Sequence, residues 1–187
     1  MPTILTHAAV PLALGLGLGA PTISRRLLAT GIVASVLPDL DVLAFRFNVA
    51  YSDDFGHRGV SHSLLFSLLL ASLAVAFSKN LKASRHTVFW FVAFCAASHG
   101  VLDTFTNGGH GVALFWPLSS ERFFAPWQVI EVSPLSLRRI ASPKGLQVMQ
   151  SEFLWVWLPA TLSFVMLLLV RRLRSNPSFN GTPGGAR

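Results

Sequence analysis

The 187-residue sequence is poor in charged residues, which make up only 12% of it. Soluble globular domains carry about 25% charge, so a water-soluble fold is disfavoured. Cysteine is scarce as well: Cys95 stands alone inside an apolar stretch, so it has no partner for a disulfide within the chain, and we expect it to be a small packing residue. No Lys or Arg precedes Arg25. Because a secretory signal peptide needs a basic start, we expect none here.

Hydrophobic residues, by contrast, make up 52% of the sequence and gather in blocks. A helix needs about 17–25 predominantly apolar residues to cross the ~30 Å hydrocarbon layer of a membrane. Five blocks approach this length and predict an all-α, polytopic membrane bundle of four to five spans: residues 4–19, 27–45, 61–77, 87–105 and 153–170. We expect a single membrane domain over residues 1–174, with an interfacial loop at 106–152 and a disordered tail at 175–187.

The net charge of +7 raises the question of nucleic-acid binding. The basic residues lie in short clusters at the borders of the spans, without the aromatic-basic stripe of a nucleic-acid surface. Such clusters are typical of topology signals and of contacts with anionic lipids, so membrane lipids are the expected partners. With five spans, three clusters share one side, which the positive-inside rule makes cytoplasmic: Arg25–Arg26, residues 79–85 and residues 171–174. Basic residues at 138–144 lie opposite, but in a long loop that counts less.

Most of the remaining ionisable residues near the span ends fall on the outer side. Ionisable side chains within spans cost roughly 2.5–3.5 kcal/mol each on insertion and usually mark a functional site. Each one taken singly is as well explained as a helix cap or a satisfied interfacial residue. Seven potential metal ligands from four predicted helices nevertheless share this face: His7, Asp39, Asp41, His57, His62, His99 and Asp103. Their convergence predicts a metal site at the outer face of the membrane.

Local spacing supports this interpretation. His99 and Asp103 are four residues apart and therefore project from one face of a helix. Asp39 and Asp41 diverge on a regular helix, so we expect Pro38 and an irregular helix end to bring them together. In the segment from His57 to Ser63, Gly59 permits a turn and Ser61 is a candidate N-cap for the third span.

The ligand types indicate which ions suit the site. Imidazole together with carboxylate favours zinc, with manganese or iron as alternatives, and four His with three Asp suffice for two or more divalent ions. Such ions activate water for hydrolysis. Arg58 is the candidate catalytic residue, because a guanidinium can stabilise charge that develops on a phosphoryl oxygen. A headgroup contact or a salt bridge to Asp53 or Asp54 is the alternative role for Arg58.

The order and spacing of these motifs are distinctive over roughly residues 1–120. They comprise Thr6-His7, Leu37-Pro38-Asp39-Leu40-Asp41, residues 57–63, Ser98-His99 with Asp103, and Phe115-Trp116-Pro117. The series resembles the bacterial YdjM-like family, described as metal-dependent hydrolases of the inner membrane. More distantly, the His99–Asp103 pair resembles the trinuclear zinc site of zinc-dependent phospholipase C and P1-type nucleases. These resemblances imply a multi-pass inner-membrane protein and favour phosphoester chemistry.

Together these features predict a membrane-bound, metal-dependent hydrolase with its site on the periplasmic face. A metal-activated water attacks a phosphoester or lipid-like small-molecule substrate in this interpretation. The sequence lacks His-Glu-x-x-His, which argues against a zinc protease of that kind. A structural metal site or a role in transport is the alternative, although a conduit needs polar residues at both membrane faces. The oligomeric state is left open.

Overall fold

The computed structural model describes residues 1–133 and 142–175, so the expected tail after Ser175 lies outside the described residues. Within these ranges the chain is helical, with two isolated β-bridges and no strand. The elements are η1 (Thr6–Ala8), α1 (Ala9–Leu18), α2 (Arg25–Val36), η2 (Leu37–Phe47), η3 (Val60–His62), α3 (Leu64–Ala76), α4 (Arg85–Thr104), α6 (Pro143–Glu152), η4 (Phe153–Trp157) and α7 (Leu158–Ser175). The predicted all-α class is confirmed.

Three continuous helices are long and apolar enough to cross a membrane: Arg25–Phe47, Arg85–Thr104 and Pro143–Ser175. Two shorter apolar helices, Thr6–Leu18 and Leu64–Ala76, complete the set. These five segments correspond to the five apolar blocks of the sequence. The last helix begins at Pro143, inside the segment expected to be an interfacial loop. Its η4 portion is a π-helical turn just before Pro159, a residue that has no amide hydrogen to continue a regular α-helical ladder.

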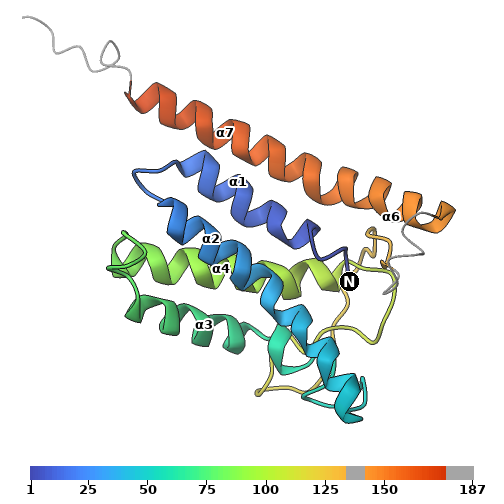
Figure 1. Ribbon diagram of the computed structural model, residues 1–187. Helices are drawn as coiled ribbons and strands as arrows, with labels where there is room; N and C mark the ends of the chain where they lie inside the picture. The colour runs from blue at the N-terminus through green and yellow to red at the C-terminus, as the bar shows by residue number, and fades with distance from the viewer. Residues whose placement is uncertain (134–141, 176–187) are drawn as a thin grey trace, which may run out of the picture.

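The helices form a layered bundle (Figure 1). Helix α7 runs along α1 at one edge, α1 also contacts α2, and α4 packs against both α2 and α3. Glycine permits the close approach of α1 and α7: a Cβ at Gly17 of α1 would lie 2.8 Å from Cβ of Leu167 in α7. The bundle is therefore held together in the way typical of membrane helices, with small residues where backbones meet.

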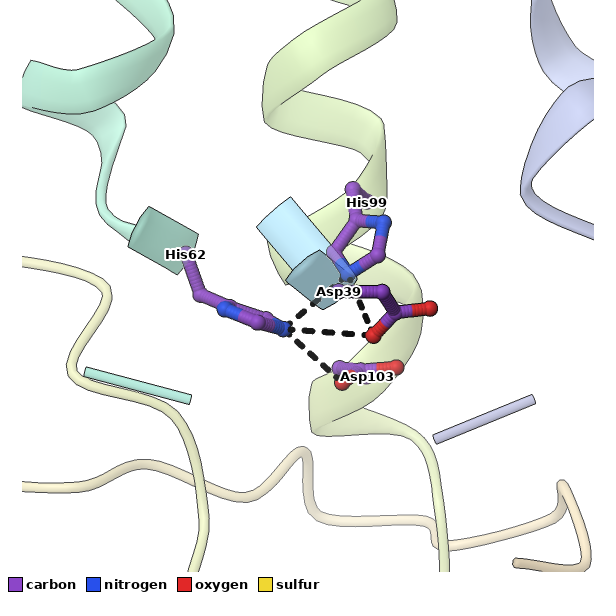
Figure 2. A group of neighbouring side chains, drawn as sticks. All are labelled: Asp39, His62, His99 and Asp103. Atoms are coloured by element: carbon purple, nitrogen blue, oxygen red, sulfur yellow. Dashed lines mark hydrogen bonds and ion pairs between the residues drawn. The ribbon is translucent and has the colours of Figure 1, made fainter. Parts of the chain in front are cut away.

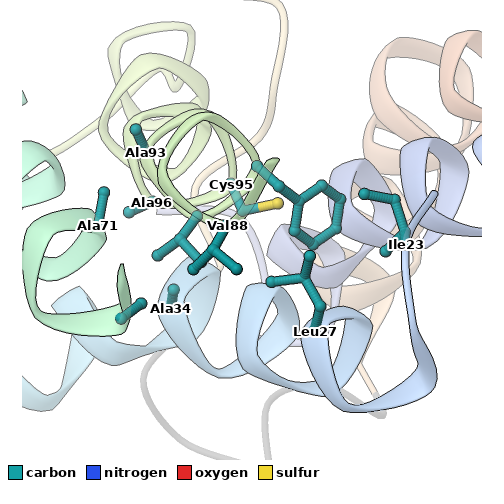
Figure 3. Close-up of a cluster of buried hydrophobic side chains, with 11 residues drawn as sticks. Ile23, Leu27, Ala34, Ala71, Val88, Ala93, Cys95 and Ala96 are labelled. Carbon is teal, nitrogen blue, oxygen red and sulfur yellow. The ribbon is translucent and has the colours of Figure 1, made fainter. Parts of the chain in front are cut away.

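The main apolar core lies between α2, α3 and α4 (Figure 3). Leu27, Val88 and Cys95 have no exposed surface in this cluster, which confirms Cys95 as a packing residue. Gly31 admits the Phe91 ring, because a Cβ at position 31 would lie 2.4 Å from its Cε1 atom. This core fills the half of the bundle that lies away from the ligand-bearing helix ends.

The three basic clusters lie at one end of the bundle, as the sequence predicts. Arg26 Nη1 donates to the carbonyl of Asn80 at 2.9 Å, which joins the α1–α2 turn to the α3–α4 turn. Arg171 Nη1 donates to the carbonyls of Leu16 and Gly17 at 3.2 and 3.1 Å. These contacts gather two basic turns and the basic end of α7, so the other ends of the helices lie at the opposite end of the bundle.

Candidate metal centre

At that opposite end, four chain segments each bring ligand-type side chains to one point. His7 lies in η1, just before α1, and Asp39 lies in η2, which continues α2. His62 ends η3, just before α3, while His99 and Asp103 occupy the last turns of α4. All five side chains are at most 3% exposed. Two helix starts and two helix ends thus meet inside the protein.

Four of these residues form a tight group, drawn in Figure 2: Asp39, His62, His99 and Asp103 each offer one ligand atom within 4.8 Å of the others. His62 Nε2 lies 3.0 Å from His99 Nε2 and 3.5 Å from Asp103 Oδ2. Asp39 Oδ1 lies 3.4 Å from His99 Nε2 and 3.9 Å from His62 Nε2. Bonds of 2.0–2.1 Å in a tetrahedral zinc site separate neighbouring ligand atoms by about 3.3 Å. The spacing of the group therefore fits one divalent ion.

His7 lies beyond this group, beside the other two carboxylate oxygens. Its Nε2 is 3.6 Å from Asp103 Oδ1 and 3.9 Å from Asp39 Oδ2. Its ring stacks on that of His99, with centroids 3.7 Å apart and planes 19° from parallel. Asp39 and Asp103 therefore each direct one oxygen toward His62 and the other toward His7. This geometry suits two carboxylates that bridge a pair of ions.

Several polar atoms at this point lack the hydrogen-bond partners that burial ordinarily requires, among the residues that the structure describes. Among the described residues, none makes an aligned hydrogen bond to either oxygen of Asp39 or Asp103, or to either ring nitrogen of His7. Buried polar groups are nearly always hydrogen-bonded, and buried charges are paired or coordinate metal ions. The donor set and its burial therefore fit bound cations.

Hydrogen bonds at the outer edge of the group turn the imidazoles inward. His99 Nδ1 lies 2.7 Å from the carbonyl oxygen of Ser35, which can only accept, so Nδ1 carries the hydrogen and Nε2 presents its lone pair. His62 Nδ1 similarly lies 3.1 Å from Oδ2 of Asp41. Metal-binding histidines are typically oriented by such partners on the second ring nitrogen.

Asp41 serves as the hub of these outer contacts. Its Oδ1 lies 2.6 Å from His57 Nδ1, and its Oδ2 accepts from Ser61 Oγ at 2.6 Å and from the Arg58 amide at 3.1 Å. Asp41, His57 and His62 also form a second group of ligand-type atoms within 4.8 Å. Asp39 therefore lies on the Nε2 side of the His62 ring, and Asp41 lies on its Nδ1 side. They do not share one point, because the tight turns of η2 direct them apart.

The fully buried Arg58 links Asp41 to the candidate metal-binding group, which consists of Asp39, His62, His99 and Asp103. Its Nε lies 3.0 Å from Asp103 Oδ2, an ion-pair distance without hydrogen-bond alignment. Its Nη1 donates to the carbonyl of Gly108 and its Nη2 to Thr106 Oγ1, both at 2.8 Å. The pairing with Asp103 replaces the headgroup contact or the Asp53 or Asp54 salt bridge considered from the sequence.

The loop that carries Arg58 is held in an unusual conformation. Arg58 has φ of 66°, and a Cβ at Gly59 would lie 1.9 Å from the backbone oxygen of Asp54. The glycine is needed for this close approach. Arg122 secures the loop by donating to the carbonyls of His57, Tyr51 and Asp53. Burial also raises the pKa of the Tyr51 phenol.

Comparison with known proteins adds a family to this geometry. The model of the family described as "YdjM inner membrane protein" matches residues 1–175. The chain belongs to this family. It is also 50% identical over 173 residues to the inner membrane protein YbcI of Escherichia coli (strain K12). The matched region covers 92% of this chain and 100% of that protein. No solved structure is significantly similar to the chain.

Family membership confirms the resemblance drawn from the motifs and extends it past residue 120. It places the chain among inner membrane proteins, in agreement with its apolar helices. Neither the family description nor the relative's name states a reaction. The buried cluster is therefore the feature of this family member that bears on its chemistry.

Several backbone and side-chain groups that orient the buried His and Asp residues of this chain were not identified from the sequence. The Ser35 and Gly108 carbonyls leave no trace in residue type, since every residue has one. Thr106 lies just past α4 and gave no motif. Gly100 admits the backbone of η3, because a Cβ there would lie 2.3 Å from the His62 carbonyl oxygen. A glycine next to a helical histidine was the one available signal.

Proposed function

We propose that this chain is a membrane-bound hydrolase that acts through divalent ions held by its buried His and Asp side chains. The observation that carries the proposal is the division of the carboxylate oxygens. Asp39 and Asp103 each face His62 with one oxygen and His7 with the other. Catalytic sites with two ions about 3.5–4 Å apart are common among phosphatases and nucleases.

Each ion has a proposed set of ligands. His62 and His99 hold the first ion together with Asp39 Oδ1 and Asp103 Oδ2, whereas His7 holds the second with the two remaining oxygens. Mixed nitrogen and oxygen ligands favour zinc, with manganese or iron as alternatives. When bound, such ions lower the pKa of a water molecule and polarise a phosphoryl or acyl oxygen.

The surrounding residues hold this arrangement in place. Asp41 accepts hydrogen bonds on both oxygens, so we assign it to orienting His57 and His62, with direct coordination as the alternative. The Nε of Arg58 pairs with Asp103, and its Nη atoms donate hydrogen bonds to the loop after α4. We therefore assign Arg58 to positioning Asp103; contact with a substrate oxygen is the alternative role.

The substrate class follows from location and chemistry. The cluster lies at one end of a membrane bundle, where amphiphiles and periplasmic phosphoesters have access. The core between the cluster and the basic end is apolar, including Leu27, Val88 and Phe91. This favours a site reached from one side over a transport route. We infer hydrolysis of a phosphoester or lipid-like substrate.

Metal analysis and hydrolysis assays test the proposal together. Purified wild-type protein, loaded with zinc or manganese, should release product from at least one member of a panel of phospholipids and phosphomonoesters. The double variant His99→Ala with Asp103→Ala should lose both metal and activity while it remains folded by circular dichroism. His86→Ala, an exposed histidine near the start of α4, is the matched control.

The outcomes separate the rival functions. Metal lost from the double variant, with no hydrolysis of any substrate by the wild type, would favour a structural metal site. Absence of metal from wild type after loading would reject the metal centre altogether. Metal-dependent uptake into proteoliposomes, abolished by the double variant, would favour transport.

A further inference from the structure

A cavity of about 610 Å³ opens beside the metal-binding group and includes Asp39 in its lining. One wall is the N-terminal segment Met1–Thr6, and the other comes from α6 and η4, including Met149 and Phe153. Its volume is typical of small-molecule sites, which span roughly 300–1,000 Å³. Asp39 is 3% exposed, and no described residue makes an aligned hydrogen bond to its oxygens, so a buried carboxylate without a hydrogen-bond partner in this part of the chain lines the cavity.

The cavity has a polar part and an apolar part. Polar residues in its lining include Asp39, Thr3, Thr6 and Glu152, whereas the apolar lining includes Leu5, Val42, Met149 and Phe153. Leu5, Met149 and Phe153 are 74%, 57% and 59% exposed, so the apolar part is open to the surroundings. In a membrane protein, a ligand can therefore enter with hydrocarbon along these side chains.

Glu152 is part of the wall and already has its hydrogen bonds. It is 4% exposed and accepts from Thr3 Oγ1 and Thr6 Oγ1, each at 2.7 Å, and from the Thr3 amide. Trp157 Nε1 donates to the same Thr6 hydroxyl at 3.1 Å. These contacts tie the N-terminal segment to the last helix and give the cavity a fixed shape beside the metal-binding group.

We propose that this cavity binds a phosphate ester that carries a hydrocarbon chain, with its phosphate at Asp39 and its chain along Leu5, Met149 and Phe153. The inference rests on the proposed function. There, two divalent ions carry more positive charge than the carboxylates of Asp39 and Asp103 carry negative charge, so they attract the negatively charged phosphate. The hydrocarbon chain gains free energy by leaving water for the apolar wall. The cavity thereby selects lipid-like over water-soluble phosphoesters.

A substitution that fills the apolar part tests this selection. Met149→Trp should raise the ratio of KM for hexadecyl nitrophenyl phosphate to KM for methyl nitrophenyl phosphate by about tenfold, equivalent to about 1.4 kcal/mol of lost binding. Leu146→Trp is the matched control, since Leu146 lies on the same helix, is also 57% exposed and does not line the cavity. The control should leave the ratio unchanged.

Photolabelling reports occupancy without hydrolysis. A diazirine analogue of hexadecyl phosphate, added to zinc-loaded protein in detergent, should label peptides containing Leu5 and Phe153, and Met149→Trp should reduce that labelling. If the analogue labels the cavity of wild-type protein but that protein hydrolyses no substrate, the hydrolase is rejected and ligand binding in the cavity is supported. Active protein in which Met149→Trp changes neither the ratio nor the labelling would overturn the binding site and retain the hydrolase.

Discussion

Arg58 and Asp103 form an ion pair with no exposed surface, in which Arg58 Nε lies 3.0 Å from Asp103 Oδ2. The same arginine donates its backbone amide to Asp41. One residue therefore fixes both a proposed bridging carboxylate and the carboxylate that orients His62. The geometry of the cluster depends on Arg58 even though it is not a metal ligand.

Arg58→Lys separates the charge of this residue from its shape. A lysine keeps the charge but has one nitrogen, which cannot reach Asp103, Thr106 and Gly108 at once. We expect zinc affinity to fall about 10–100-fold, as is typical when a partner of a ligand is lost. Isothermal titration of detergent-solubilised protein measures this change. Unchanged zinc affinity together with lost hydrolysis would instead indicate that Arg58 contacts the substrate.

His7→Ala tests whether the two carboxylates bridge a pair of ions. Among the described histidines, His7 is the one that faces their second oxygens, so its loss should leave the first site intact and reduce the metal content from two ions per chain to one. Elemental analysis of metal-loaded protein gives the count. His110→Ala, which removes an exposed imidazole from the loop after α4, is the control. Two ions retained by His7→Ala would contradict the bridged arrangement.

Gly100→Ala should disturb the cluster without changing a ligand. Alanine favours a helix over glycine by about 1 kcal/mol, so a stability gain is expected if nothing else intervenes. Here the new Cβ would lie 2.3 Å from the His62 carbonyl oxygen, and backbone cannot move aside cheaply. We therefore expect lower thermal stability and weaker zinc binding. Val101→Ala, at the neighbouring position, is 40% exposed and should change neither.

Glu152→Gln tests the tie between the two ends of the chain. The amide retains one acceptor oxygen but turns a donor toward groups that already donate, leaving buried polar atoms unsatisfied. Such a loss costs about 1–3 kcal/mol, so thermal unfolding should occur at a lower temperature. Glu131→Gln, at a carboxyl that is 32% exposed and paired with Lys144, should have a smaller effect. Equal stability of the two variants would show that Glu152 does not anchor the N-terminal segment.

Reporter fusions test which membrane face carries the cluster. The basic ends at Arg26, Lys82 and Arg171 lie together, and the positive-inside rule assigns that end to the cytoplasm. A fusion at Lys82 and one after Arg174 should both report cytoplasmic location, which would leave the candidate metal-binding group on the periplasmic side. A periplasmic signal from both fusions would reverse the orientation.

The sequence by itself determined the helical membrane class and the shared end of seven ligand-type residues. Apolar blocks of span length dictate helices, because backbone groups in hydrocarbon need partners within their own segment. Alternation of direction from span to span then brings His7, Asp39, His62 and His99 to one face. The short spacing of His99 and Asp103 also placed both correctly on one side of α4.

Only the tertiary structure decided which of these residues lie at the centre of the cluster and which lie at its edge. Ser63, not Ser61, caps α3, because Ser61 lies in the turn that reaches Asp41. The tight turns of η2 direct Asp39 into the cluster and Asp41 to its edge. Arg58 reaches Asp103 because it lies in a loop whose conformation depends on the close packing around Gly59. Such contacts join residues far apart in the chain, often through backbone carbonyls, so residue type and spacing do not encode them locally.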